Sequence, residues 1–323
     1  MDMNRLLNAT TTVTGAILLA LTCFSGNAQA EILVIDGMTP ANSPEFTDIQ
    51  SITIDRFGGR DGRALAFEVE DRLSAVTIFG QPYFDVIGGR SAVEPDASLS
   101  GNVTAGIDQY ETVAKRRRCI ERDDKDKCVT YKNIDVDCVT RTIDFRAQVR
   151  GTRYSDGRSL YTESFPHKNE QTVCFGDDQD FASSESVIRT MLSDTANAIR
   201  NDLAPAQYRQ EIRILESRKG MSKAEGQYFK AAVKMTKNDP QEACRMWDEA
   251  AANGMVHISL LFNRALCAEQ RGELEAALAL YEEAERLSPG KIEVTQSLQR
   301  VSDHQRALDE WALRQSGGVE NQR

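Results

Sequence analysis

The sequence predicts two successive folds: an α+β domain, with an antiparallel or mixed sheet and helices on one face, and then an all-α helical-repeat domain. Two observations lead to this prediction. Short strand-like runs alternate with two helical stretches in the first part of the chain, and the last third repeats itself at a spacing of 34 residues. With 323 residues, the chain is long enough for two separate cores.

The first part begins with an entry segment over 31–50. A strand then follows at 52–54, and a glycine-rich loop at 57–63 leads into a helix over 64–76. That helix places Leu65, Val69 and Leu73 on one face. Later strands are predicted at 83–87, 97–104, 138–150 and 160–164. A second helix over 182–203, with Ile188, Leu192, Ala196 and Ile199 facing inward, closes the domain near Pro205.

A connecting helix is predicted next, because Tyr208, Ile212 and Leu215 fall on one helical face. The predicted divisions are a signal peptide over 1–30, the α+β domain over 31–205, the connecting helix over 206–223, the repeats with a capping helix over 224–314, and a disordered tail over 315–323.

Small and aromatic residues recur in the repeats. They are Ala231, Ala243, Trp247 and Ala250, then Ala265, Ala277, Tyr281 and Ala284. This helix-turn-helix period resembles the tetratricopeptide (TPR) family, in which small residues let paired helices approach closely. The resemblance implies a module that binds proteins or packs on its own chain. It also implies a concave groove lined by an apolar stripe, which consists of Tyr228, Met235, Phe262 and Leu266. Either a peptide occupies this stripe, or the cap or the first domain covers it as core.

Three sequence features indicate an exported protein. Residues 16–24 form an apolar run, and Ala28-Gln-Ala30 fits a signal-peptidase site, so we expect cleavage after Ala30 and a periplasmic location. The alternative is lipid attachment at Cys23. The six remaining cysteines suggest disulfides.

The spacing of those cysteines favours one set of pairs. Cys119 and Cys128 flank a charged hairpin tip, while Cys138 and Cys174 lie nearly symmetrically about a turn at Ser155-Asp-Gly157. Cys244 and Cys267 fall on neighbouring repeat helices, where they are either bonded or buried free thiols.

Four short motifs stand out in the first domain: the strand, glycine loop and helix of 52–76, Phe84-Asp-Val-Ile87, Leu99-Ser-Gly-Asn-Val103, and the hairpin from Cys138 to Tyr161. Together they resemble the CsgG-like family, which includes the LpoB type of envelope protein. The resemblance implies an envelope domain that binds other proteins and is not an enzyme. It allows a homo-oligomer formed through this domain.

Composition and motifs favour binding over catalysis. The formal charge of −10 argues against nucleic acid as a partner, and Lys115-Arg-Arg-Arg118 is the only basic run. None of His167, His257 and His304 has a metal-ligand neighbour at a useful spacing, so we expect no metal and no cofactor. Nothing in the chain after the leader is long enough for a membrane-spanning helix.

We therefore predict a non-enzymatic envelope scaffold that binds partner proteins in assembly, secretion or peptidoglycan synthesis. One alternative is an exported enzyme or anion-binding protein that uses the Gly58–Arg63 loop, where Arg60 and Arg63 precede a helix N-terminus. A second alternative is an oligomeric secretion accessory.

Overall fold

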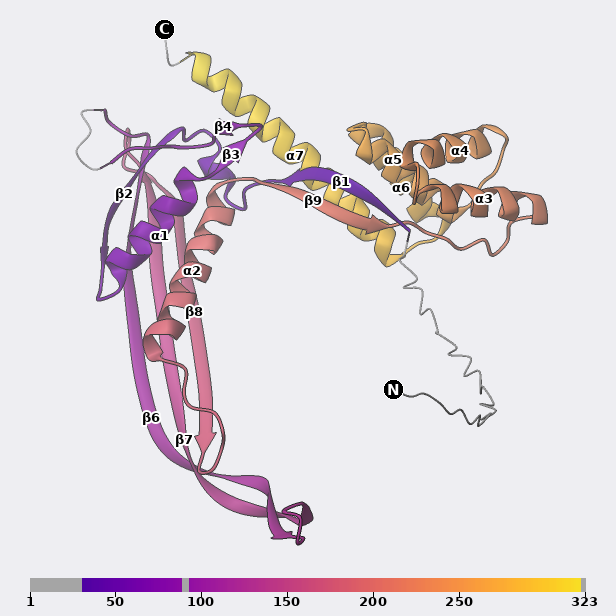
Figure 1. Ribbon diagram of the computed structural model, residues 1–323. Helices are drawn as coiled ribbons and strands as arrows, with labels where there is room; N and C mark the ends of the chain where they lie inside the picture. Colours follow the sequence, from indigo (N-terminus) through magenta and orange to yellow (C-terminus); the bar gives the residue numbers. More distant parts are fainter. Residues whose placement is uncertain (1–30, 89–92, 321–323) are drawn as a thin grey trace, which may run out of the picture.

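The computed structural model describes residues 31–88 and 93–320. The predicted signal peptide and Cys23 lie outside the described residues. The chain forms an α+β unit with a long projecting arm and a helical unit of paired helices, and a two-stranded ribbon joins them (Figure 1). The α+β composition predicted from the sequence is confirmed. Among the described helices, none combines the length and the apolar character that crossing a membrane requires.

A five-stranded sheet with the order β5-β2-β6-β7-β8 forms the α+β unit. Strand β2 runs parallel to β5 and β6, whereas β6, β7 and β8 are mutually antiparallel. Two tiny strands, β3 and β4, make a separate hairpin. The elements of this unit are η1 (Pro44–Phe46), β2 (Ser51–Gly58), α1 (Gly62–Ser74), β3 (Thr77–Ile78), β4 (Gln81–Pro82), β5 (Asp85–Val86), β6 (Ala97–Arg122), β7 (Cys128–Arg153), β8 (Ser159–Cys174) and α2 (Ser184–Leu203).

Helices α1 and α2 pack on one face of this sheet and supply much of its core. The predicted face of α1 is confirmed, since Leu65, Val69 and Leu73 are fully buried. Ser183 caps the N-terminus of α2, because its hydroxyl accepts a hydrogen bond from the Ser186 amide. Its apolar face meets β7 and β8, where alternate side chains point toward the helices.

The segment after α2 is a strand, so the predicted connecting helix over 206–223 is wrong. Strand β9 (Ala206–Arg213) pairs with β1 (Ile32–Thr39) as a two-stranded antiparallel ribbon. A spacing of four residues, as between Tyr208 and Ile212, satisfies a strand period of two as well as a helical turn, so the pattern could not separate them. The segment is a strand and not a helix because every residue of β9 pairs with a residue of β1.

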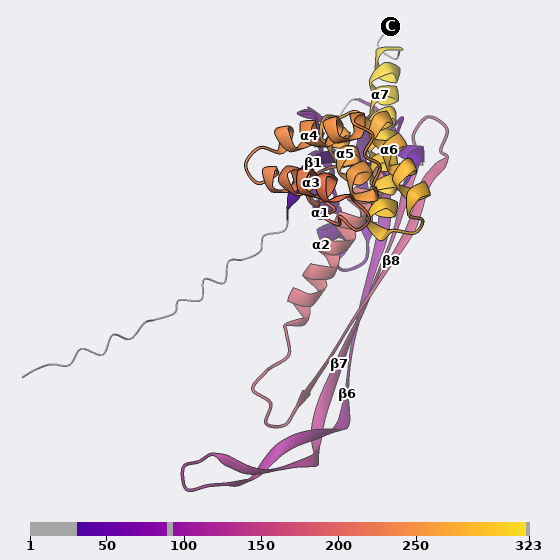
Figure 2. The same cartoon turned by 90° about the vertical axis from the view of Figure 1, so that its right-hand side faces the viewer.

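The helical unit contains two antiparallel helix pairs and one long final helix. These are α3 (Lys223–Met235), α4 (Pro240–Ala252), α5 (Ile258–Gln270), α6 (Leu274–Leu287) and α7 (Ile292–Glu320). Figure 2 shows the paired helices beside α7. The tail predicted to be disordered from Gln315 is instead helical through Glu320. This end of α7 is anchored on the α+β unit, where Trp311 stacks on Tyr83 and Arg314 is buried.

Most of the predicted packing residues of the repeats are buried between the helices. Trp247 and Tyr281 are completely buried. The predicted small residues are buried as well: Ala243, Ala250, Ala265, Ala277 and Ala284. The prediction that Ala231 packs between the helices is wrong, because Ala231 is exposed and its neighbour Ala232 is fully buried. In the burial pattern, Ala232 corresponds to Ala265 at a spacing of 33 residues, whereas Trp247 corresponds to Tyr281 at 34.

Candidate functional site: the arm of β6 and β7

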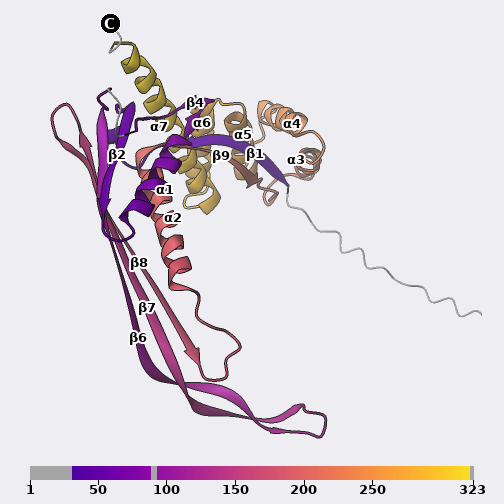
Figure 3. The same cartoon turned by 60° about the vertical axis from the view of Figure 1, so that its left-hand side comes forward.

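Strands β6 and β7 are each 26 residues long and pair along almost their whole length. The predicted strands at 97–104 and 138–150 are only the proximal parts of them. At about 3.3 Å per residue, such a strand extends roughly 85 Å, far beyond the core of the unit. Strand β8 ends at Cys174, opposite Cys138, so two strands alone continue outward. We call residues 107–139 the arm; it projects away from the helices and bends beyond the end of β8 (Figures 1 and 3).

Two disulfides brace the arm, one at its base and one near its tip. Cys138 is bonded to Cys174 and Cys119 to Cys128, and both predicted pairings are confirmed. The register explains the first pair, because Cys138 and Cys174 are directly opposite in the β7–β8 ladder. These bonds stabilise a region with little core of its own: beside Cys138 and Cys174, only Val136 and the partly buried Ala114 form an apolar cluster there.

Two arginines of the basic run Lys115–Arg118 make internal contacts, one within the arm and one to the segment that follows β8. Arg117 lies over the Tyr131 ring at 4.3 Å from its centroid. Arg118 donates to the Phe175 and Gly176 carbonyl oxygens and to Asp177 Oδ1, the last at 2.9 Å. A hydrogen bond from the Cys174 amide, with help from Arg118, lowers the pKa of Asp177 below its ordinary value. Lys115 remains exposed.

Exposed apolar side chains are concentrated on the arm. Of the 17 large hydrophobic residues that are exposed in the described chain, eight lie within these 33 residues: Ile107, Tyr110, Val113, Ile120, Val129, Tyr131, Ile134 and Val139. Val113 is 61% exposed and Val129 56%. Exposed apolar side chains gathered in one segment are typical of protein-interaction surfaces.

The outer edge of β6 is open along the arm. Strand β2 pairs only with Ala97–Asn102 of β6, and β7 occupies the other edge. From Val103 to Arg122, the described chain places no further strand beside β6. Alternate residues therefore present unpaired N–H and C=O groups, which is how a sheet edge accepts another strand.

The predicted TPR groove is closed by the protein itself. Phe262 and Leu266 are completely buried, and Tyr228 and Met235 are half-buried against the same core. The ribbon of β1 and β9 lies on α5, where Gln270 Nε2 donates to the Val34 carbonyl oxygen at 3.1 Å. Of the two interpretations of the apolar stripe, its burial favours covered core at Phe262 and Leu266.

Polar contacts also bind α5 to its surroundings at the groove. The Asn263 side chain makes two hydrogen bonds to the Leu215 backbone, at 2.8 and 3.0 Å. Glu269, with its side chain fully buried, forms a bidentate ion pair with Arg300 of α7 at 2.7 and 2.8 Å. The third predicted disulfide, Cys244–Cys267, joins α4 to α5 and is confirmed.

The Gly58–Arg63 loop packs on β6. Gly59 has a positive φ of 87°, and any Cβ there would collide with the Val103 carbonyl group. Arg60 and Arg63 are exposed, and Arg63 lies over the Phe67 ring at 5.4 Å. The glycines are thus accounted for by the close approach of backbone to backbone, without a bound anion.

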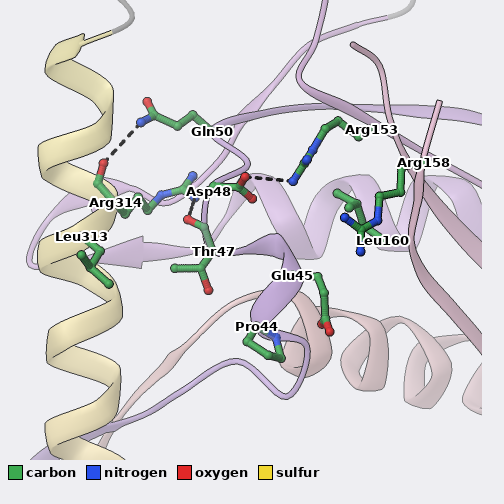
Figure 4. Close-up of a pocket in the computed structure, with 10 residues that line it drawn as sticks. All are labelled: Pro44, Glu45, Thr47, Asp48, Gln50, Arg153, Arg158, Leu160, Leu313 and Arg314. Carbon is green, nitrogen blue, oxygen red and sulfur yellow. Dashed lines mark hydrogen bonds and ion pairs between the residues drawn. The ribbon is translucent and has the colours of Figure 1, made fainter. Parts of the chain in front are cut away.

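A pocket of about 540 Å³ lies where α7 meets the α+β unit (Figure 4). Within the α+β unit, Arg153 pairs with Asp48 at 2.9 Å. Arg314 of α7 is buried and joins this helix to the α+β unit by donating to the carbonyl oxygens of Thr47, Ile49 and Tyr83. Burial lowers the pKa of Arg314 from its ordinary value, and the Tyr83 ring lies 4.1 Å below the guanidinium.

The three histidines occupy structural positions. His167 hydrogen-bonds Thr195 at 3.0 Å, His257 caps α5 by accepting from the Ser259 amide, and the ring of His304 packs edge-on against Tyr208. Within residues 31–88 and 93–320, there is no group of three His, Cys, Asp or Glu side chains suited to hold a metal ion.

No model of a known protein family matches the sequence, and no curated protein matches it. Several solved structures are similar over about half of the chain. The uncharacterized lipoprotein B from Nitrosomonas europaea is 11% identical, over 48% of this chain and 83% of its own, with a TM-score of 0.27. A minor lipoprotein from Acinetobacter baumannii is 12% identical over 48% and 90%, with a TM-score of 0.23. PelC from Paraburkholderia phytofirmans, a dodecamer, is 12% identical over 53% and 98%, with a TM-score of 0.23. Similarities at these scores support no conclusion about function.

Proposed function

We propose that this protein is a non-enzymatic adaptor of the bacterial envelope that docks partner proteins through the tip of its arm. The observation that carries the proposal is the exposure of Ile120, Val129 and Tyr131 on two strands that the Cys119–Cys128 bond holds together. Apolar side chains on a braced hairpin lose little conformational freedom when they bind, because the backbone is already ordered.

Three disulfides support an oxidising compartment, as expected for an exported chain. In the proposal, the leader is cleaved after Ala30, the α+β unit is a CsgG-like domain, and the helical unit is a short TPR array. Such an array would be too short to stand alone, which agrees with the ribbon and α7 packed against it. Its groove would then seat the ribbon, and partner binding would fall to the arm.

Site-specific photo-crosslinking in the living envelope tests the proposal. A photoreactive phenylalanine analogue replaces Tyr131 at the tip, and in a matched control it replaces Tyr154, an equally exposed tyrosine off the arm. We expect a discrete crosslinked partner from position 131 and none from position 154. A third position, Tyr228, reports on the helical groove. Crosslinks confined to Tyr228, or none from the tip, would contradict docking through the arm.

A further inference from the structure

The charges of β6 are separated along the arm. Asp108 and Glu111 stand in its inner half, and the basic run Lys115–Arg118 in its outer half. Val113 lies between them and is 61% exposed. A strand that is acidic at one end and basic at the other complements itself when a second copy approaches in the opposite direction.

We propose that the open edges of β6 from two copies pair antiparallel about Val113, which makes the protein a two-fold dimer. In this register Val113 faces Val113 of the second copy, and Lys115 faces Glu111. Arg116 then faces Tyr110, a cation and an aromatic ring that attract each other. The two-fold symmetry makes each of these unlike pairs occur twice.

The other long edge of the sheet is less suited to pairing. Strand β8 carries Pro166 near its middle, opposite Arg146, and proline cannot donate a hydrogen bond to an added strand. Lys168 follows two residues later and is exposed. Proline and lysine on an edge strand hinder its pairing with a strand of another chain. The open part of β6, from Val103 to Arg122, contains no proline. This asymmetry favours a closed dimer through β6 over a ring that joins β6 of one copy to β8 of the next.

The inference goes beyond the proposed function, because it concerns the edge of β6 and not the tip of the arm. A charge-swap experiment on the mature chain tests it by sedimentation velocity over a range of concentrations. We expect the wild type to dimerise, and Lys115→Glu and Glu111→Lys each to weaken self-association by about tenfold or more, because each creates two like-charge pairs.

An equimolar mixture of the two variants is the decisive sample. A heterodimer restores both pairs, since the introduced glutamate of one chain meets the introduced lysine of the other, and the unchanged Glu111 of the first meets the unchanged Lys115 of the second. We therefore expect the mixture to recover dimers. Fraying of the arm cannot explain this recovery, because mixing two frayed chains would not repair either.

Lys132→Glu is the matched control: it makes the same charge change on β7 and should leave dimerisation unchanged. The variant Ile120→Ser at the tip should also retain the dimer, which separates this proposal from partner docking. A wild type that stays monomeric at every concentration would overturn the proposal. So would single variants that dimerise as the wild type does, or a mixture that associates no better than its components.

Discussion

The buried pair of Glu269 and Arg300 gives a quantitative test of whether the groove of the helical unit is closed. Glu269 has no exposed side-chain surface and Arg300 only 12%, so water cannot replace a missing partner. Exposed ion pairs contribute about 0–1 kcal/mol, but removing one member of a buried pair costs about 3–5 kcal/mol, because the other charge stays buried alone.

The structure also predicts the order of the two losses. After Glu269→Met, Arg300 keeps a hydrogen bond to Ser297 Oγ at 3.1 Å. After Arg300→Met, the fully buried Glu269 carboxylate keeps only the Tyr281 hydroxyl at 2.9 Å. We therefore expect Arg300→Met to lower the free energy of unfolding by an amount near the upper end of the range of about 3–5 kcal/mol and Glu269→Met by an amount near its lower end. The double variant should lower it by much less than the sum of the two single losses, because no charge then remains buried.

Urea unfolding followed by the fluorescence of Trp247 measures these free energies in the helical unit. The chain has two tryptophans, so a Trp311→Phe background leaves Trp247 as the only reporter. Additive losses, within about 0.5 kcal/mol, would refute the reasoning, since residues in contact couple and distant ones do not. Losses below about 1 kcal/mol for both single variants would show an open, hydrated groove instead.

Two further outcomes follow from the helical unit and the ribbon. Ala232→Leu should destabilise the protein by about 1–3 kcal/mol in the same assay, because it overpacks a filled core, whereas Ala231→Leu on the exposed face should change stability by less than about 0.5 kcal/mol. Burial, followed by the negative charge of Glu269, raises the pKa of Tyr208 to about 12. Because the folded form holds this proton more tightly, its contribution to stability is complete below pH 10 and is lost as the pH rises through about 12. The pKa values of Tyr83, Tyr161, Tyr228 and Tyr281 are raised as well, so the measurement is the difference between the ultraviolet titrations of the wild type and of Tyr208→Phe, which should lose one ionisation near pH 12.

Local patterns in the sequence identified the elements that have one buried face. Leu65, Val69 and Leu73 mark α1 because a single side of that helix meets the sheet. The pair Cys138–Cys174 was predictable because the turn at Ser155–Gly157 fixes the register of β7 and β8.

The features that the sequence did not reveal depend on partners far along the chain. Both faces of the outer arm meet solvent, so β6 and β7 lack the alternation of apolar and polar residues that marks a half-buried strand. Strand β9 carries a pattern compatible with a helix. Only its pairing with β1, which comes much earlier in the sequence, makes it a strand. Phe262 is buried in the core that also contains Leu33 and Ile35 of β1, so the predicted groove is covered and the exposed apolar residues lie on the arm.

The pairing of β1 with β9 also limits when this protein can fold. Thr39 and Ala206, which meet at one end of the ribbon, are 167 residues apart in the chain. If the chain crosses a membrane from its N-terminus, β1 emerges early and must wait, with Leu33 and Ile35 uncovered, until β9 and α5 have followed. Contacts between such distant segments form slowly. For this interval the new protein exposes an unpaired apolar strand, and a chaperone that binds extended segments would protect it at that stage.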